Sequence, residues 1–275
     1  MNLSPALNVA VRAARDAGRI ALRHFDQLHR LEIREKAPQD LVTNADLEVE
    51  EILISQLKKA YPQYGILAEE SGRQGDNKGL HWIIDPIDGT LNFSRGLPHF
   101  AISIALARGT DVQGGLIYDP VRDELFTAEK GRGAFLNDRR MRVSQQPHMV
   151  ASLLGTGFPF RHQELKEPYL KAFREVLQRA GEVRRAGSAA LDLAYVAAGR
   201  FDAFWELRLS PWDIAAGQLM VTEAGGYVSD MTGDKNHMRS GDIVAGNTDI
   251  QPQLLELLQH NKLDDLPPRP AVQKS

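Results

Sequence analysis

The chain has 275 residues, a formal net charge of −3, 43% hydrophobic residues and 25% charged residues, which is ordinary for a soluble globular protein. That charge predicts no general affinity for nucleic acid or for anionic membranes. The absence of cysteine excludes disulfides, thiolate metal sites and cysteine nucleophiles, and it fits a reducing cytoplasm. No apolar run approaches the roughly 18 residues of a membrane span, and Arg12, Arg15 and Asp16 interrupt any signal-peptide core. We therefore expect a soluble, cytoplasmic protein.

The N-terminal region shows two helical patterns. Ser4-Pro5 is a good helix start, and apolar residues then recur at helical spacing from Leu7 to Phe25. A second helix is predicted from Thr43 until Tyr61-Pro62 ends it. Its inward residues are predicted to be Val49, Ile52, Leu53, Leu57 and Ala60.

Strand patterns follow. The apolar run 82–84 predicts a buried strand that Asp85 ends, and residues 100–106 alternate large and small apolar side chains, which predicts a strand with a small-residue second face. Segments 115–118 and 124–127 predict further strands joined at Asp119-Pro120. The basic, glycine-punctuated stretch from Lys130 to Arg142 predicts a hairpin.

The second half alternates helices and strands, which indicates a layered α/β or α+β body. Helices are predicted at 165–180 and 188–198, from Ser210-Pro211 to Gly225-Gly226, and at 250–258. Strands are predicted at 201–207, 227–229 and 243–245. We expect an N-terminal half over residues 1–145, a C-terminal half over 146–262 and a disordered tail over 263–275.

The stretch HWIIDPIDGT places two aspartates three positions apart after an apolar run. Asp85 and Asp88 suit simple turn formation, and Asp88 also suits the cap of a helix that begins near Leu91. Equally, paired acids at the end of a strand suit a site for something positively charged.

Three other acidic positions have ordinary structural explanations. Asp46 follows Thr43, and Asp213 follows Ser210, at the spacing of a capping box. Glu69-Glu70 suits an exposed acidic turn. Taken one at a time, none of these acids indicates a site.

Convergence of these acids would need cations. Two carboxylates about 4 Å apart repel by up to roughly 4 kcal/mol at an effective dielectric of 20. Oxygen-only ligands suit Mg²⁺ rather than Zn²⁺. A strand-to-helix turn through Gly89 would also direct backbone N–H groups at an anion. Mg²⁺ beside an anion pocket describes a phosphate site, although spacing alone leaves the convergence open.

The chain resembles the inositol monophosphatases, a family of Mg²⁺-dependent, lithium-sensitive phosphatases. The motifs that carry the resemblance are Glu69-Glu-Ser71, Asp85-Pro-Ile-Asp-Gly-Thr90 with Leu-Asn-Phe93, Trp212-Asp213 with Ile-Ala-Ala-Gly217, Asp40-Leu-Val-Thr-Asn-Ala-Asp46, Gly187-Ser-Ala-Ala190 and Glu223-Ala-Gly-Gly226. The match runs from Leu7 to Asn247. Segments 155–160 and 184–195 are most similar to the bacterial branch of the SuhB type. The resemblance implies an α+β fold, a layered αβαβα sandwich, and a homodimer.

The resemblance also implies roles for individual residues. The first Mg²⁺ would be held by Glu69, Asp85 and the backbone carbonyl of Ile87, and the second by Asp85, Asp88 and Asp213. A third ion would lie near Glu69, by a loop from Lys36 to Asp40 that is one residue shorter than in the animal enzymes.

The remaining roles concern attack and substrate binding. A metal-bound water would attack phosphorus, assisted by Glu69 and by Thr90 hydrogen-bonded to Asp46. The Gly89 and Thr90 N–H groups would cradle the phosphate. The residues expected to face the alcohol are Gly187, Ser188, Ala189 and Glu206, with Glu206 and Asp213 accepting hydroxyl hydrogen bonds.

The substrate implied by the resemblance is inositol 1-phosphate, a small phosphorylated polyol. Leu91-Asn92-Phe93 is similar to the inositol monophosphatases, whereas bisphosphate nucleotidases tend to have Lys-Glu-Phe and histidinol-phosphatase relatives Arg-Ala-Phe. Fructose-1,6-bisphosphatase activity stays open, because some relatives accept both substrates. Two residues separate Asp85 from Asp88, so the Asp-x-Asp motif of aspartyl-phosphate enzymes is absent.

The most basic stretch contains Lys130, Arg132, Arg139, Arg140 and Arg142, and we expect it to be a solvated hairpin face. Bacterial members that resemble this chain are also linked to transcription and RNA processing through protein contacts. The basic stretch and Arg184-Arg185 are therefore candidates for a partner surface or a dimer interface.

Overall fold

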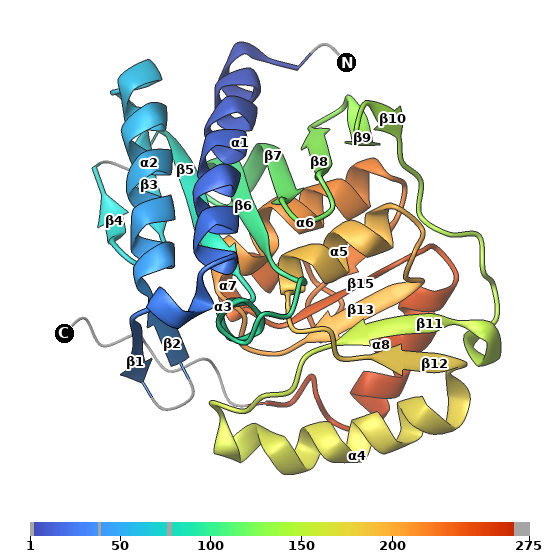
Figure 1. Ribbon diagram of the computed structural model, residues 1–275. Helices are drawn as coiled ribbons and strands as arrows, with labels where there is room; N and C mark the ends of the chain where they lie inside the picture. Colours follow the sequence, from blue (N-terminus) through green and yellow to red (C-terminus); the bar gives the residue numbers. More distant parts are fainter. Residues whose placement is uncertain (1–2, 38–39, 76–78, 267–275) are drawn as a thin grey trace.

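The computed structural model describes residues 3–37, 40–75 and 79–266, and its helices and sheets stack in five layers (Figure 1). Helices α1 (Pro5–Phe25) and α2 (Asn44–Ala60) cover one face of an eight-stranded sheet, whose other face packs on α5 (Ala189–Ala197) and α6 (Pro211–Glu223). A five-stranded sheet follows, and α4 (Gln163–Arg179) and α8 (Ile250–His260) form the last layer. The predicted αβαβα sandwich is confirmed.

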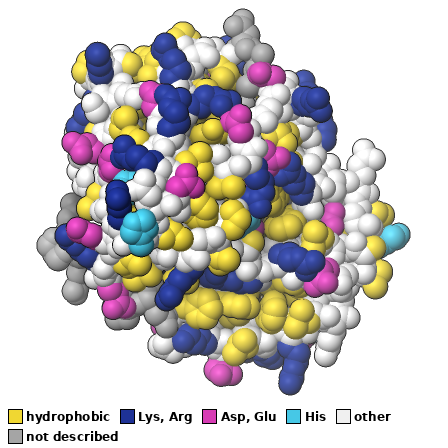
Figure 2. Space-filling view, in the orientation of Figure 1, with side chains coloured by type: hydrophobic (Ala, Val, Ile, Leu, Met, Phe, Trp, Pro, Cys, Tyr) yellow, Lys and Arg dark blue, Asp and Glu magenta, His cyan; other side chains and the backbone are white. Residues whose placement is uncertain are grey.

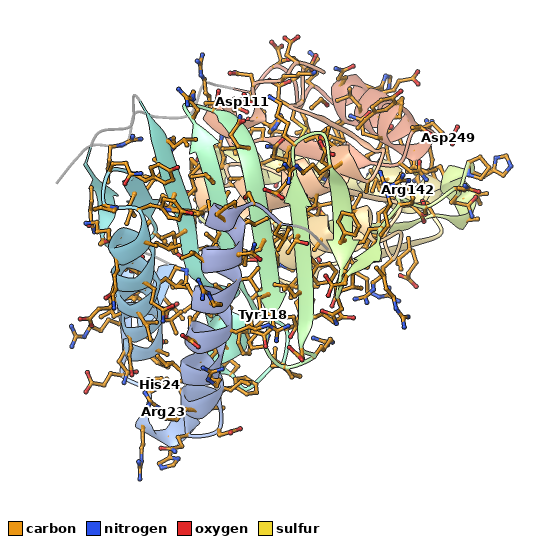
Figure 3. All side chains as sticks on the ribbon, turned by 90° about the horizontal axis from the view of Figure 1, so that it is seen from above. Arg23, His24, Asp111, Tyr118, Arg142 and Asp249 are labelled. Carbon is orange, nitrogen blue, oxygen red and sulfur yellow. The ribbon has the colours of Figure 1, made fainter. Side chains whose placement is uncertain are left out.

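Helix α1 lies unusually close to the eight-stranded sheet. Ser4 caps it, since its Oγ accepts from the Leu7 N–H at 3.3 Å, and Pro5 is its first residue, as predicted. Its inner face is made of small residues, and a Cβ built on Gly18 would lie 2.6 Å from Tyr118 Cε1. Figure 3 shows α1 running along the face of the sheet near Tyr118.

Helix α2 begins as the sequence predicts. Thr43 is the N-cap, and Asp46 Oδ2 accepts from the Thr43 N–H at 2.8 Å and lies 2.6 Å from its hydroxyl. The prediction that Ala60 faces inward is wrong, because Ala60 is exposed beside Lys58 and Lys59. Tyr61 takes the inward place one turn after Leu57, and its ring centroid lies 6.2 Å from that of Trp82.

The eight-stranded sheet is mostly antiparallel, with strand order β10-β9-β8-β7-β6-β5-β3-β4 and β3 parallel to β5. Its strands are β3 (Gly65–Ala68), β4 (Gly72–Gln74), β5 (Leu80–Asp88), β6 (Ala101–Arg108), β7 (Asp111–Asp119), β8 (Glu124–Glu129), β9 (Gly133–Leu136) and β10 (Arg139–Arg140). Both faces of β6 are buried: Ile102 and Ile104 pack under α1 and α2, while Ala101 and Ala105 face α5 and α6. The predicted small-residue second face is confirmed, and it lets α6 approach closely.

Strand β5 does not end at Asp85, contrary to the prediction, but continues to Asp88. Asp85 pairs with Ser103 and Asp88 with Ala101, so three steps along β5 oppose two steps along β6. In a regular strand, residues three apart point to opposite faces. This bulge shifts the alternation and so allows both carboxylates to serve one site.

The five-stranded sheet has the order β12-β11-β13-β15-β14. Its strands are β11 (Leu153–Thr156), β12 (Glu182–Arg184), β13 (Ala203–Glu206), β14 (Tyr227–Ser229) and β15 (Ile243–Gly246). The sequence analysis predicted β13, β14 and β15 but missed β11 and the edge strand β12. Leu263 is buried against this sheet's outer helices, and residues 267–275 of the predicted tail lie outside the described residues.

Smaller elements connect the layers. They are a hairpin of β1 (Ile33–Ala37) and β2 (Asp40–Thr43), helices α3 (Thr90–Ser94) and α7 (His237–Ser240), and the single turns η1 (Leu28–Arg30) and η2 (Met149–Ala151).

Helix α6 lies between the two sheets and buries residues around its whole circumference, from Ile214 to Val221. Within the described part of the chain, every helix is too short or too polar to cross a bilayer.

Candidate metal and phosphate site

Three carboxylates from distant segments meet between the sheets. Asp85 and Asp88 come from β5 and Asp213 from the first turn of α6, and one oxygen of each lies within 4.8 Å of the others. Asp213 is oriented by the predicted capping box, because its Oδ2 accepts from the Ser210 N–H at 2.6 Å. Asp85 is 1% exposed, and its Oδ1 has no hydrogen-bond partner among the described residues.

Asp88 does not cap the helix near Leu91, contrary to one prediction. Gly89 is the N-cap of α3. The Asp88 Oδ2 atom instead accepts from the Ser188 hydroxyl and, at 2.8 Å, from the Ala190 N–H at the start of α5. Asp88 therefore joins the first sheet to the helix layer that follows it.

Glu69 and Glu70 follow β3 and are directed inward. Their side chains are 16% and 6% exposed, so the prediction of an exposed acidic turn is wrong. Glu50 of α2 fixes this turn, since its carboxylate accepts from the Glu70 and Ser71 N–H groups at 2.8 Å each.

Lys36 of β1 is the cation that the sequence analysis did not assign to the site. Its Nζ lies 3.0 Å from Glu69 Oε1 and 2.6 Å from Glu70 Oε1. Burial disfavours the Lys36 ammonium, but the two carboxylates outweigh burial and raise its pKa. A lysine in a short polar hairpin carries no sequence signal of such a contact, because its partners are distant in the chain.

The acids disturb one another's ionisation. Burial raises the pKa of Asp85 well above its usual range, and the nearby Glu69, Asp88 and Asp213 carboxylates raise it further. Burial also raises the pKa of Asp213, followed by the charge of Asp88 and then that of Glu69. Converging acids of this kind are costly without a cation.

The residues present fit a hard divalent cation. All the donors are oxygen atoms, which Mg²⁺ prefers. One buried oxygen, Asp85 Oδ1, is left without a partner among the described residues, where a cation would satisfy it. The cluster is therefore a candidate metal site on the evidence of its own geometry.

Thr90 and Asp46 meet beside this cluster, as predicted. The Thr90 hydroxyl lies 3.2 Å from Asp46 Oδ1 and 3.1 Å from the Ile87 carbonyl oxygen. Burial raises the pKa of Asp46 to about 6, against the hydrogen bonds from Thr43 that lower it. This carboxylate is thus poised to exchange a proton near neutral pH.

The glycine turn after Asp88 is tightly constrained. Gly89 has φ 98°, and a Cβ there would lie 3.1 Å from the His99 carbonyl oxygen and 3.3 Å from that of Gly187. Gly187 has φ 92°, and a Cβ on it would lie 2.7 Å from Arg185 Nη1. Asn92 Nδ2 joins the two turns by donating to the His99 and Ala186 carbonyls, at 2.8 and 2.9 Å.

Glu206 lies at the end of β13, close enough to Asp88 for the charge of Asp88 to affect it. Its carboxylate covers Gly157 so closely that a Cβ there would lie 1.9 Å from Glu206 Cδ. Burial raises the pKa of Glu206 to about 8, and the charge of Arg185 only partly opposes this. Arg185 in turn lies over the Phe160 ring, with its Cζ 5.4 Å from the centroid.

The sequence analysis also missed Asp192 of α5. Its Oδ1 is buried with no hydrogen-bond partner among the described residues, and burial raises its pKa well above the usual range. Glu206 and Asp88 add to that rise. In the sequence Asp192 looks like any polar helix residue, so only the fold shows that it faces the site.

A layered fold that gathers buried carboxylates beside a glycine turn defines the class of metal-dependent phosphatases. Comparison with known proteins makes this specific, since the inositol monophosphatase family model matches residues 2–263. This chain belongs to the inositol monophosphatase family.

Individual relatives agree. The chain is 48% identical over 262 residues to the Nus factor SuhB of Pseudomonas aeruginosa, covering 94% of this chain and 97% of that relative. It is 48% identical over 260 residues to an inositol-1-monophosphatase of Mesorhizobium japonicum, covering 94% and 98%. The crystal structure of the extragenic suppressor protein SuhB of Bartonella henselae superimposes with a TM-score of 0.90 at 46% identity, covering 93% of this chain and 99% of that one.

Proposed function

We propose that this phosphatase is a Mg²⁺-dependent inositol-1-monophosphatase, which hydrolyses inositol 1-phosphate to inositol and phosphate. The observation that carries the proposal is the convergence of Asp85, Asp88 and Asp213 within 4.8 Å, with a buried oxygen of Asp85 unsatisfied among the described residues. The relative named inositol-1-monophosphatase supports this choice of substrate. We also propose a cytoplasmic location and sensitivity to lithium.

The proposed ion ligands come from both halves of the chain. Glu69, Asp85 and the Ile87 carbonyl would hold one Mg²⁺, and Asp85, Asp88 and Asp213 would hold another. A third ion would lie at Glu69, close to Lys36. Bound Mg²⁺ lowers the pKa of coordinated water and neutralises charge on the phosphoryl group. The proposed halves, residues 1–145 and 146–262, then meet at the site, with Asp213 supplied by the second.

The chain's own proton acceptor in this proposal is the Thr90–Asp46 pair. Asp46 Oδ2 is engaged with Thr43, so its Oδ1 is the oxygen directed at the Thr90 hydroxyl. With a pKa of about 6, Asp46 is mostly ionised at pH 7 and can take a proton through Thr90. Glu69 is the second candidate base.

Substrate contacts complete the proposal. The Gly89 and Thr90 N–H groups would bind the phosphate, in a turn where the φ of 98° and the nearby carbonyl oxygens favour glycine over a residue with a side chain. The alcohol lies against the residues Gly187, Ser188 and Ala189. Glu206 and Asp213 hydrogen-bond its hydroxyls, and the raised pKa of Glu206, about 8, lets this group donate as well as accept.

The test is hydrolysis by the purified chain with Mg²⁺. We expect inositol 1-phosphate to be hydrolysed faster than 3′-phosphoadenosine 5′-phosphate and fructose 1,6-bisphosphate, with inhibition by lithium. An Asp213→Asn variant should lose at least about 100-fold in rate, because a ligand and its charge are removed while the side-chain volume is kept. Faster turnover of the nucleotide, or a trapped aspartyl-phosphate on Asp85, would overturn the proposal.

The relatives that are named Nus factor support a second role. We propose that this chain also contacts protein partners of the transcription machinery, independently of hydrolysis. A Glu69→Gln variant separates the two roles. Loss of phosphatase activity with retention of the cellular role supports separate functions, whereas loss of both in a folded protein shows that the cell uses catalysis.

We further propose a homodimer formed through α4 and the edge strand β12. Leu170 and Leu177, seven residues apart on α4, are 52% and 53% exposed, and Val150 is 75% exposed. Figure 2 shows hydrophobic side chains gathered in a patch in the lower part of the view, where Figure 1 places α4. A sheet edge beside an exposed apolar patch suits pairing with a second copy.

A further inference from the structure

A second hollow lies away from the acid cluster, between the β9–β10 hairpin and the end of α5. Its volume is about 530 Å³, and four arginines line it: Arg139, Arg140, Arg142 and Arg200. Glu124 is its one acidic lining residue. The sequence analysis expected the hairpin arginines to form a solvated face. They are exposed, but they also enclose a concave site.

Glu124 forms an ion pair with Arg200. The Arg200 guanidinium pairs with both carboxylate oxygens, and its Nη1 lies 2.7 Å from Glu124 Oε2. Arg200 also lies over the Tyr195 ring, 4.9 Å from its centroid. The remaining three arginines make no ion pair with an acidic side chain anywhere in the described part of the chain. The charged residues that line the hollow are therefore four arginines and one glutamate, a positive balance.

Backbone geometry holds these arginines in place. Pairing of β10 with β9 sets Arg139 opposite Leu136. Gly133 has φ 92°, and a Cβ there would lie 3.0 Å from Arg140 Nη2, so the glycine leaves room for that guanidinium. Gly199 has φ 69°, and a Cβ there would lie 3.0 Å from the Arg142 carbonyl oxygen, which lets the hairpin's exit pack on the end of α5.

Another carboxylate near this hairpin accepts hydrogen bonds from the backbone. Glu223 of α6 accepts from the Gly131 and Gly133 N–H groups, at 2.7 and 2.8 Å. It makes no ion pair with Arg140 among the described residues. Glu223 thus stabilises the hairpin through the backbone, and its carboxylate lies outside the lining of the hollow.

The hollow is separate from the phosphatase site. Asp88 contacts the first turn of α5 through Ser188 and Ala190, whereas Ala198 and Arg200, which line the hollow, follow the last turn. The nine-residue helix puts roughly 14 Å between them. Figure 3 places Arg142 at the side of the molecule away from α2 and β4.

We propose that this hollow, which we name the arginine pocket, binds a small phosphorylated anion through Arg139, Arg140 and Arg142. Planar guanidinium forks match phosphate oxygens in pairs. Leu136, Met141 and Ala198 give the pocket an apolar part that suits the rest of such a molecule. The volume of about 530 Å³ falls within the range of small-molecule sites, roughly 300–1,000 Å³.

The experiment is calorimetric titration of the full chain with inorganic pyrophosphate in EDTA, where the acid cluster holds no ion and repels anions. We expect saturable binding that an Arg139→Ala/Arg142→Ala variant weakens at least roughly tenfold. The matched control is Arg132→Ala, which removes a charge from the same hairpin outside the pocket, and it should bind as the parent does. Arg139→Lys/Arg142→Lys keeps the charge but loses the forks, so its binding should be intermediate.

Phosphatase activity and melting temperature establish that the variants are folded, because the pocket shares no residue with the acid cluster. Equal binding by the double alanine variant, or no saturation, would overturn the proposal. Displacement of pyrophosphate by a short RNA or a polyglutamate peptide that binds more than about tenfold tighter would also overturn it, since the face would then be a macromolecular surface.

Discussion

Asp85 carries a carboxyl group whose ionised form is opposed by its surroundings. It is 1% exposed, with one oxygen unpartnered among the described residues and three other carboxylates close enough to raise its pKa. In the absence of metal, an amide should therefore be tolerated better than the acid.

The first prediction concerns Asp85→Asn. Without metal, the variant should melt at least about 2 °C above the parent, because a buried acid whose ionisation is opposed by burial and by neighbouring carboxylates is replaced by a neutral amide. With excess Mg²⁺ the parent should gain stability, by about 2.7 kcal/mol at 100 times its dissociation constant, and the variant should gain far less.

Thermal melting in EDTA and in Mg²⁺ measures both. Asp111→Asn, at an exposed ion pair, is the control and should change neither. A variant that melts lower than the parent in EDTA would contradict the argument.

The second prediction is the pH dependence of the metal-free protein. Burial raises the pKa of Asp46 and of Asp88 from 3.8 to about 6, so the folded state binds more protons than the unfolded state between these values. Stability contributed by the protonated groups is present below pH 4 and is lost as the pH rises through 6. The free energy of unfolding measured in EDTA should therefore fall from pH 4 to 7 because of this cluster. The fall should be smaller in Asp85→Asn.

The same pKa shifts make metal binding pH-dependent. Protons must leave the carboxylates before Mg²⁺ binds, so affinity should rise between pH 5 and 7, by up to about tenfold per unit for each proton released. Titration of Mg²⁺ at several pH values measures the slope. A pH-independent affinity would show that the cluster is already ionised in the folded protein.

At the scale of elements, the close contact between α1 and β7 depends on a glycine, Gly18, which has no side chain. A Cβ on Gly18 would meet Tyr118 at 2.6 Å, and the ring is fixed in place because its hydroxyl donates to Asp123 at 2.8 Å.

The third prediction is that Gly18→Ala destabilises the protein. Overpacking of this kind costs about 1–3 kcal/mol, which outweighs the gain of up to about 1 kcal/mol in helix propensity. Gly79→Ala is the matched control, because a Cβ there meets nothing within 4 Å. Chemical denaturation measures both variants. Equal stability of Gly18→Ala and the parent would mean that α1 shifts at little cost.

Local sequence signals predicted the elements that begin with their own caps. Ser4-Pro5, Thr43 with Asp46, and Ser210-Pro211 mark the starts of α1, α2 and α6, and the structure has each of them. The bulge of β5 was not predictable in this way. Asp85-Pro86 looks like the end of a strand, and only pairing with β6 carries the backbone on to Asp88.

At the scale of the whole molecule, the candidate dimer surface is apolar and lies on the outermost layer. Leu170 and Leu177 face away from the core that the rest of α4 covers. No contact within the described chain buries them, so a second copy is the proposed cover.

The fourth prediction is that Leu170→Lys/Leu177→Lys converts the proposed dimer to a monomer. Two buried ammonium groups without partners would cost several kcal/mol at an apolar interface. Light scattering with size-exclusion chromatography measures the mass. Val121→Lys, at an exposed apolar residue in the turn between β7 and β8, is the control and should have the same mass as the parent. A parent that is already monomeric would end the homodimer proposal.

The candidate site could be predicted only in part, because it is assembled across the whole chain. The motif residues Glu69, Asp85 and Asp88 follow one another closely enough to attract notice. Their meeting with Asp213 depends on the stacking of two sheets around α6, which no spacing encodes. Lys36 and Asp192 carry no signal at all, since each looks like an ordinary polar residue of its element.

The burial of α6 between the two sheets has a consequence for synthesis of the protein. The ribosome completes β5 long before it reaches Asp213. Helix α6 has no polar face that could be exposed to water before the second sheet has formed. A nascent chain therefore holds only part of the cation-binding set until the later sheet closes over the helix. The complete set of carboxylates should therefore be assembled in a single late event of folding.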